Sequence, residues 1–216
     1  MIYSKYIISG FLVASLILAG CGSEQADNNS TSTVQQQEQK AEAPKKVEKA
    51  KTLQQQALED NNASMNQKNA LKKAISYANN MHMSKARVYR QLTSEHGAKF
   101  PEEDAQWAME RLSDIDWKKN ALESAKNYAG SSMHMSKSRV YNQLISDHGA
   151  MFTEEEAQWA MEHLTADWKK NALESAKNYQ NNMAMSIDRI RQQLVSPHGG
   201  QFTEEEAQYA IDNLPK

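Results

Sequence analysis

The 216-residue chain carries 25 basic and 27 acidic side chains, which gives a formal net charge of −2. This balance provides no general attraction to nucleic acid or to anionic lipid surfaces, so any partner must be recognised locally. The single cysteine excludes internal disulfide bonds, and the fold must therefore be held together by packing alone.

Residues 1–20 are predicted to be a lipoprotein signal peptide. Lys5 precedes an apolar run that ends at Ala19, and this run is too short for a permanent membrane-spanning helix. The run leads into Leu18-Ala19-Gly20-Cys21, a sequence typical of bacterial lipoproteins. We expect the Cys21 sulfur to be acylated, as with palmitate, and Cys21 to become the new N-terminus. The protein is then anchored to the cell membrane on its extracytoplasmic face, whereas the alternative is a buried or unpaired thiol.

Residues 21–66 are predicted to be the lipidated cysteine and a flexible linker. The segment consists mainly of small, polar and charged residues, which bury too little apolar surface to offset the entropy of ordering. A short helix is possible between Val47 and Leu58, but the sequence does not indicate what would hold it.

The rest of the chain repeats one pattern three times, which predicts modules at 67–115, 116–166 and 167–216. Ala70-Leu71 returns as Ala121-Leu122 and Ala172-Leu173, each time after 51 residues. Periods near this length are typical of tandem arrays, and apolar residues at helical spacing predict three helices in each copy. The expected fold is all-α, with three tandem three-helix modules.

Capping residues predict where the helices of each copy begin and end. Serines open the second helix and glycines end it, and a capping box opens the third helix of copies two and three, where copy one has Pro101. An Asp-Trp pair lies where one copy meets the next, and copy one has Asn66 in place of the Trp. The tryptophan is therefore expected to dock each copy onto its predecessor. These residues are Ser84, Ser136, Ser186, Gly97, Gly149, Gly199, Thr153, Thr203, Asp116, Trp117, Asp167 and Trp168.

The lipoprotein box, the polar linker and copies that read A-L-x-x-A-x-x-Y, M-x-M-S, Q-L, H-G, F-T-E-E-E-A-Q-[WY]-A and D-W-K-x-N-A-L resemble the host cell surface-exposed lipoprotein family, often called Ltp-like. The resemblance covers essentially the whole exported chain. It implies a small membrane-anchored protein built of helix-turn-helix-like modules. It also implies superinfection exclusion, in which the protein engages the tape-measure protein of an incoming phage and stops entry of its DNA.

The third helix of each copy offers a candidate surface for a protein partner. An aromatic residue and acidic residues project from the face opposite the apolar stripe, and such a surface favours a basic partner. Two alternatives remain open: half-buried aromatic residues wedged between neighbouring helices, and glutamates that only favour the helix dipole. The candidate residues are Glu103, Trp107, Glu110, Glu155, Trp159, Glu162, Glu205 and Tyr209.

The acidic third helices argue against nucleic acid as a partner, because phosphates would repel them. The second helices are basic instead, with Lys85, Arg87 and Arg90 in copy one and Lys137 and Arg139 in copy two. These charges either face solvent or orient neighbouring modules or a partner.

The Met-x-Met runs raise the alternative of an extracytoplasmic Cu(I)-binding protein, because thioether and imidazole groups suit soft metals. Met81-His82-Met83 and Met133-His134-Met135 carry a histidine, but Met183-Ala184-Met185 does not. The simpler interpretation is that both methionines fill a gap between helices, with no metal bound. No catalytic constellation is evident, so we predict neither an enzyme nor a cofactor. A peptidoglycan-associated structural lipoprotein of the cell envelope is a further alternative.

Overall fold

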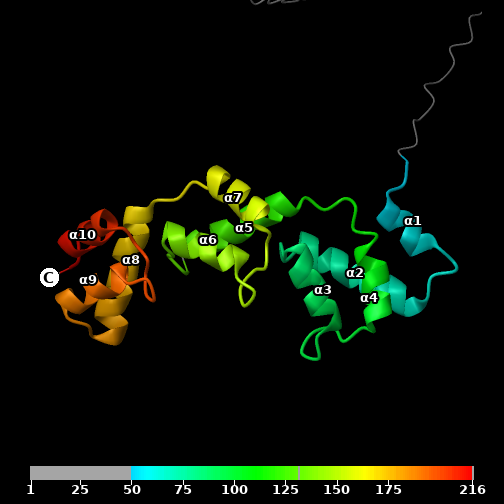
Figure 1. Ribbon diagram of the computed structural model, residues 1–216, viewed down its shortest axis with the longest axis horizontal. Helices are drawn as coiled ribbons and strands as arrows, with labels where there is room; N and C mark the ends of the chain where they lie inside the picture. Colours follow the sequence, from blue (N-terminus) through cyan, green and yellow to red (C-terminus); the bar gives the residue numbers. More distant parts are fainter. Residues whose placement is uncertain (1–49, 131, 216) are drawn as a thin grey trace, which may run out of the picture. The chain divides into compact units, whose positions relative to one another are not determined.

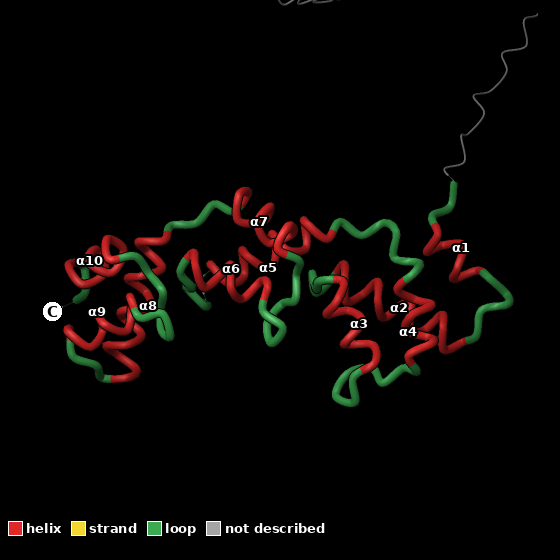
Figure 2. The backbone as a smooth tube through the Cα atoms, viewed as in Figure 1, coloured by secondary structure: helices red, strands yellow, loops and turns green. Residues whose placement is uncertain are grey.

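The computed structural model describes residues 50–130 and 132–215; the predicted signal peptide, Cys21 and most of the predicted linker lie outside them. Every regular element in the described part is an α-helix, as predicted (Figures 1 and 2). No helix there combines the length and hydropathy needed to cross a membrane. The helices are α1 Leu53–Glu59, α2 Met65–Asn79, α3 Lys85–Thr93, α4 Glu102–Met109, α5 Trp117–Ala129, α6 Lys137–Ile145, α7 Glu154–His163, α8 Trp168–Met183, α9 Ile187–Val195 and α10 Glu204–Asp212.

After α1, the helices form three successive three-helix repeats, each with its own small core. Repeat 1 consists of α2 to α4, repeat 2 of α5 to α7, and repeat 3 of α8 to α10, and in each the first helix packs chiefly against the third. Two large aliphatic residues of each second helix are fully buried, and alanines of the first and third helices close around them. A core of this size is marginal alone, so contacts between repeats matter for stability.

The predicted N-caps are confirmed. The hydroxyl groups of Ser84, Ser136 and Ser186 accept the backbone N–H three residues on, at the start of α3, α6 and α9. Thr153 and Thr203 form complete capping boxes with Glu156 and Glu206. In repeat 1 the N-cap of α4 is Pro101, which makes no side-chain hydrogen bond.

The predicted role of the glycines as helix ends was wrong. The second helix of each repeat stops at a serine in an extended conformation, and Gly97, Gly149 and Gly199 lie in the following turn. None of the described glycines has a positive φ angle, so the left-handed helix end usual for glycine is not used. Glycine is required instead because the turn passes close to the preceding helix: a Cβ atom on Gly149 would lie 2.3 Å from the Gln143 carbonyl oxygen.

The Met-x-Met-Ser loops share an unusual backbone conformation. The central residues His82, His134 and Ala184 adopt the left-handed region, with φ angles of 49°, 47° and 50°. The first methionine of each loop is exposed, whereas the second, such as Met83, packs against the core of its repeat. The interpretation that both methionines fill a gap therefore holds only for the second. No group of three or more His, Cys, Asp or Glu side chains in the described residues is placed to hold a metal.

Helix α1 lies inside the segment that the sequence predicted to be a flexible linker. Thr52 and Gln55 form a capping box at its start, and Ala57 is buried in the core of repeat 1, with Leu58 packed beside it. The apolar residues that hold this helix come from the repeat that follows it. The sequence of the segment alone therefore could not predict that repeat 1 stabilises α1.

Each junction between repeats is formed first by an asparagine and a serine on the first helix of the following repeat. The Asn120 side chain donates to the carbonyl groups of Ala78 at 2.8 Å and Met83 at 3.1 Å, and the Ser124 hydroxyl donates to the His82 carbonyl at 3.1 Å. At the second junction, Asn171 and Ser175 make the same bonds to Ala129, Met135 and His134. The Met-x-Met loops therefore serve as acceptors for the next repeat.

The second helix of the preceding repeat completes the junction. The Ser84 hydroxyl donates to the Ala150 carbonyl at 2.6 Å, Arg87 donates to the Gly149 carbonyl, and Arg90 donates to the Asp147 carbonyl at 2.7 Å. Arg139 repeats the contact with the Gly199 carbonyl at 3.0 Å. Of the two sequence-based interpretations of these basic residues, orientation of the neighbouring module is therefore confirmed for three arginines.

The predicted docking role of the junction tryptophans is also confirmed. Trp117 packs against the core of repeat 1, and Trp168 packs against the core of repeat 2. Asp116 and Asp167 cap the helices that carry them.

Candidate protein-binding surface

The predicted acidic residues lie on the outer, exposed face of the third helices. Ala105 and Ala108 on α4 are fully buried, whereas Glu103 and Glu110 on the opposite side are exposed. The same division recurs on α7 and α10, where alanines are buried and Glu155, Glu162 and Glu205 are exposed. Within each repeat the helix thus brings the predicted residues onto one face.

The three aromatic residues differ in their surroundings. Trp107 is half-buried against the core of repeat 1, and the Arg111 guanidinium lies 4.0 Å from its ring centroid. Trp159 is half-buried and stacks on the His163 ring at 3.9 Å. Tyr209 is 40% exposed, with the Lys169 amino group 5.8 Å from its ring. Packing against the core thus explains why Trp107 is half-buried, whereas Tyr209 has the most accessible ring of the three. The role of all three in binding stays a prediction.

Two of the predicted glutamates are engaged in ion pairs. Lys118 on α5 pairs with Glu155 at 2.7 Å, and Lys169 on α8 pairs with Glu205 at 2.6 Å, both at the exposed surface. The hydrogen bond from the lysine, followed by its charge, lowers the pKa of each glutamate, and the same contacts raise the pKa of each lysine. In repeats 2 and 3 this surface therefore carries both signs of charge.

Repeat 1 presents a different charge pattern. Gln67 stands in α2 where α5 and α8 have Lys118 and Lys169, so Glu103 lacks the matching lysine. Glu110 lies 3.6 Å from Arg111 at the other end of the helix. These cationic neighbours were not predicted from the sequence. The lysines of the two Asp-Trp-Lys motifs are visible in the sequence. Only the packing of the first helix against the third shows which glutamate each lysine pairs with.

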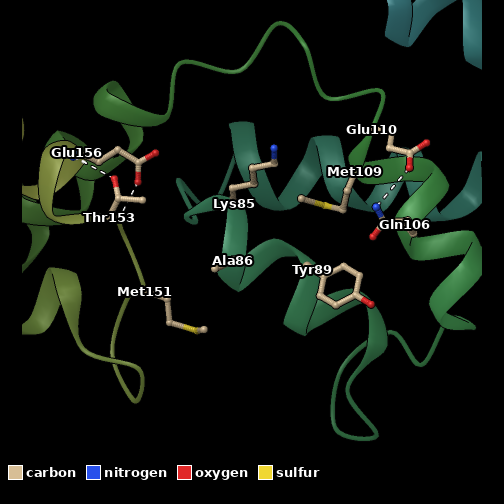
Figure 3. A pocket seen from close by; sticks show the side chains of 9 residues that line it. All are labelled: Lys85, Ala86, Tyr89, Gln106, Met109, Glu110, Met151, Thr153 and Glu156. Atoms are coloured by element: carbon tan, nitrogen blue, oxygen red, sulfur yellow. Dashed lines mark hydrogen bonds between the residues drawn. The ribbon is translucent and has the colours of Figure 1, made fainter.

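A groove beside this surface was not predicted. It has a volume of about 420 Å³, and Ala86, Tyr89 and Met109 of repeat 1 supply apolar walls together with Met151 from the next repeat (Figure 3). Lys85 and Glu156 add charged groups to its lining. Methionine and tyrosine together make an adaptable lining for an apolar side chain.

Repeat 2 has a similar groove, lined by Lys137, Tyr141 and Met161. In repeat 3 the tyrosine position is Arg191, which pairs with Glu204 at 3.3 Å. The recurrence of tyrosine in two copies and its loss in the third was the sequence signal for this feature.

The model of a family described as host cell surface-exposed lipoprotein matches residues 66–112, 116–164 and 167–214. Curated proteins gave no match. A solved structure, that of Ltp, a superinfection exclusion protein from the Streptococcus thermophilus temperate phage TP-J34, shares 43% sequence identity, with a TM-score of 0.41. The alignment covers 45% of this chain and 95% of that one.

Proposed function

The chain belongs to the host cell surface-exposed lipoprotein family, and on this premise we propose that it is a membrane-anchored exclusion protein. It binds an ejection component of an incoming phage, the tape-measure protein in the first instance, and thereby blocks injection of DNA. The lipid anchor is Cys21, and the modules act at the extracytoplasmic face of the membrane.

The observation that carries this proposal is the threefold family match across residues 66–214, together with exposed carboxylates on every third helix beside an aromatic ring that is half-buried in repeats 1 and 2 and exposed in repeat 3. A rigid aromatic side chain supplies binding energy and the carboxylates select basic partners. Three related faces on one tethered chain also add avidity toward an elongated target. Steric capture of the ejected protein near the membrane then prevents DNA from following.

The ion pairs in repeats 2 and 3 supply a mechanism of selection. A basic side chain of the partner has to replace Lys118 or Lys169 at the exposed carboxylate, which costs little because both members of each ion pair are exposed and solvent screens their attraction. In repeat 1 the position of the pairing lysine is occupied by Gln67. A basic partner can therefore engage the Glu103 carboxylate without displacing a lysine.

The test separates phage adsorption from DNA entry. Cells that express the anchored protein are expected to adsorb phage normally but to contain little phage DNA after infection, measured by quantitative amplification of intracellular phage DNA. A Cys21→Ser variant, which lacks the acylated sulfur, should lose most of the protection. Normal DNA entry into cells that carry the anchored protein would refute the proposal.

Surface variants then test where the partner binds. Glu103→Gln, Glu110→Gln and Tyr209→Ala change exposed side chains and should weaken protection without loss of helicity by circular dichroism. The matched control is Lys72→Ala, an exposed residue on α2, the first helix of repeat 1. Full protection by all three variants would remove the aromatic and acidic face from the proposal. Sedimentation of the protein with purified peptidoglycan would favour the cell-envelope alternative instead.

A further inference from the structure

In the described residues, repeats 1 and 3 each leave exposed one of the two complementary halves of the junction that joins the repeats. Asn120 and Asn171 are only 6% and 5% exposed inside the junctions, whereas the equivalent Asn69 of repeat 1 is exposed. The turn that accepts hydrogen bonds in repeats 2 and 3 has its counterpart in repeat 1 at Gly97, which is exposed. We call Asn69 and the carbonyl groups of residues 95–98 the front face of repeat 1.

The opposite half lies on repeat 3. Ser84 and Ser136 are 1% and 0% exposed in the two junctions, whereas Ser186 is exposed. Arg189, the counterpart of Arg87 and Arg139, is also exposed, and in the described residues it bonds only within its own helix, to Gln192 at 3.4 Å. Ala184 keeps the left-handed backbone of the acceptor loop. We call Ser186, Arg189 and the carbonyl groups of residues 180, 184 and 185 the back face of repeat 3.

We infer that a second copy of this chain occupies the front face, so that the back face of repeat 3 in one molecule docks onto repeat 1 of the next. The inference continues an interface that the chain itself forms twice. Asn69 would donate to the carbonyl groups of Gln180 and Met185, and Ser186 and Arg189 would donate to those of Ala98 and Gly97. This self-association does not depend on the proposed phage target.

Two substitutions make the contact between molecules weaker than the contacts within one. Asn66 replaces the docking tryptophan, and Lys73 replaces the serine that donates to the Met-x-Met loop. The hydrogen-bonding groups remain, but the aromatic anchor that dominates such interfaces is absent. Association is therefore expected at high local concentration, as on a membrane that holds many lipid-anchored copies. A head-to-tail contact that does not close forms an open chain of molecules.

Sedimentation velocity of the mature chain, with Cys21→Ser to remove the lipid, tests the inference. The native sequence should pass from monomer to a ladder of oligomers as its concentration approaches about 1 mM, the effective concentration that short tethers provide. The double variant Asn66→Trp with Lys73→Ser restores both junction residues and should associate at least about tenfold more tightly. A native chain that stays monomeric over this range would overturn the inference.

Single substitutions in exposed residues establish which faces meet. Asn69→Ala and Arg189→Ala should each reduce association by about fivefold or more, because each removes a donor to an acceptor in the interface. Arg191→Ala, on the same helix but paired with Glu204 inside repeat 3, is the matched control and should change nothing. Circular dichroism checks that all variants stay folded. Oligomers that persist unchanged in Asn69→Ala and Arg189→Ala would mean a different interface and would also overturn the inference.

Discussion

The Asn120 side chain donates a hydrogen bond to the Ala78 carbonyl across the first junction, at 2.8 Å. The same amide also bonds to the Met83 carbonyl, so one side chain satisfies two main-chain acceptors of the preceding repeat. Buried carbonyl groups need such partners, because an unsatisfied one costs free energy. Asn120, on the first helix of repeat 2, therefore joins repeat 2 to repeat 1 without being part of the apolar core of either repeat.

Asn120→Ala should lower the free energy of unfolding by about 2 kcal/mol, because two carbonyl groups lose their donor in a buried site. Asn69→Ala changes the equivalent residue of repeat 1, which is exposed, and should alter stability by less than about 0.5 kcal/mol. Urea unfolding of the lipid-free chain, followed by circular dichroism, measures both. Equal effects of the two substitutions would contradict the role assigned to the junction amide.

The left-handed backbone of Ala184 leads to a second prediction. An alanine with a φ angle of 50° is strained, so Ala184→Gly should raise the free energy of unfolding by up to about 1 kcal/mol. Ala184 is exposed, and little packing is lost with its methyl group.

Ala86→Gly is the matched control for this change, because Ala86 is an exposed alanine inside helix α3. Glycine at this position, in the first turn of α3, should lower the free energy of unfolding by up to about 1 kcal/mol. Thermal unfolding should therefore show shifts of opposite sign. A decrease in both variants would argue against relief of strain at Ala184.

Helix positions and caps could be predicted from the sequence because their determinants are local. Ser84 followed by a helical apolar pattern, or Thr153 followed by Glu156, specifies a helix start within four residues. Repetition also exposed the docking role of Trp117, since copy one lacks both a predecessor and the tryptophan.

Features set by contacts between distant segments could not be predicted. The left-handed φ angle of His82 is associated with a carbonyl group that accepts from Ser124, 42 positions later, and no local signal marks it. Gly149 resembles a helix end in sequence, but its lack of a side chain serves a close approach to Gln143. Likewise Lys118 and Glu155 meet only because the first helix packs on the third. The charge character of the candidate surface depends on such pairs.

Acid should weaken the fold through the pairs between first and third helices. The hydrogen bond and charge of Lys118 lower the pKa of Glu155 below the ordinary value of 4.5. The ion pair therefore contributes fully to stability at pH values above 4.5. The contribution is lost as the pH falls through the lowered pKa, when the carboxylate takes up a proton. Glu205 behaves in the same way with Lys169.

The double variant Glu155→Gln with Glu205→Gln removes both titrating groups. Its urea midpoint should therefore fall less than that of the native chain between pH 7 and pH 3. Glu103→Gln is the control, because Gln67 stands where the pairing lysine lies in the other repeats. If all three proteins lost the same stability on acidification, these ion pairs would have no part in the pH dependence.

Stability and partner binding should separate at the aromatic residues of the third helices. Trp107 packs against the core of repeat 1, so Trp107→Ala should lower the free energy of unfolding by about 2 kcal/mol through lost apolar burial. Tyr209 is 40% exposed, and Tyr209→Ala should cost less than about 1 kcal/mol. Protection against phage should decrease in both variants if these faces bind the ejection component, but only Trp107→Ala should also shift the unfolding midpoint appreciably. Loss of protection that followed loss of stability across both variants would mean that the aromatic residues act through the fold and not through contact with the partner.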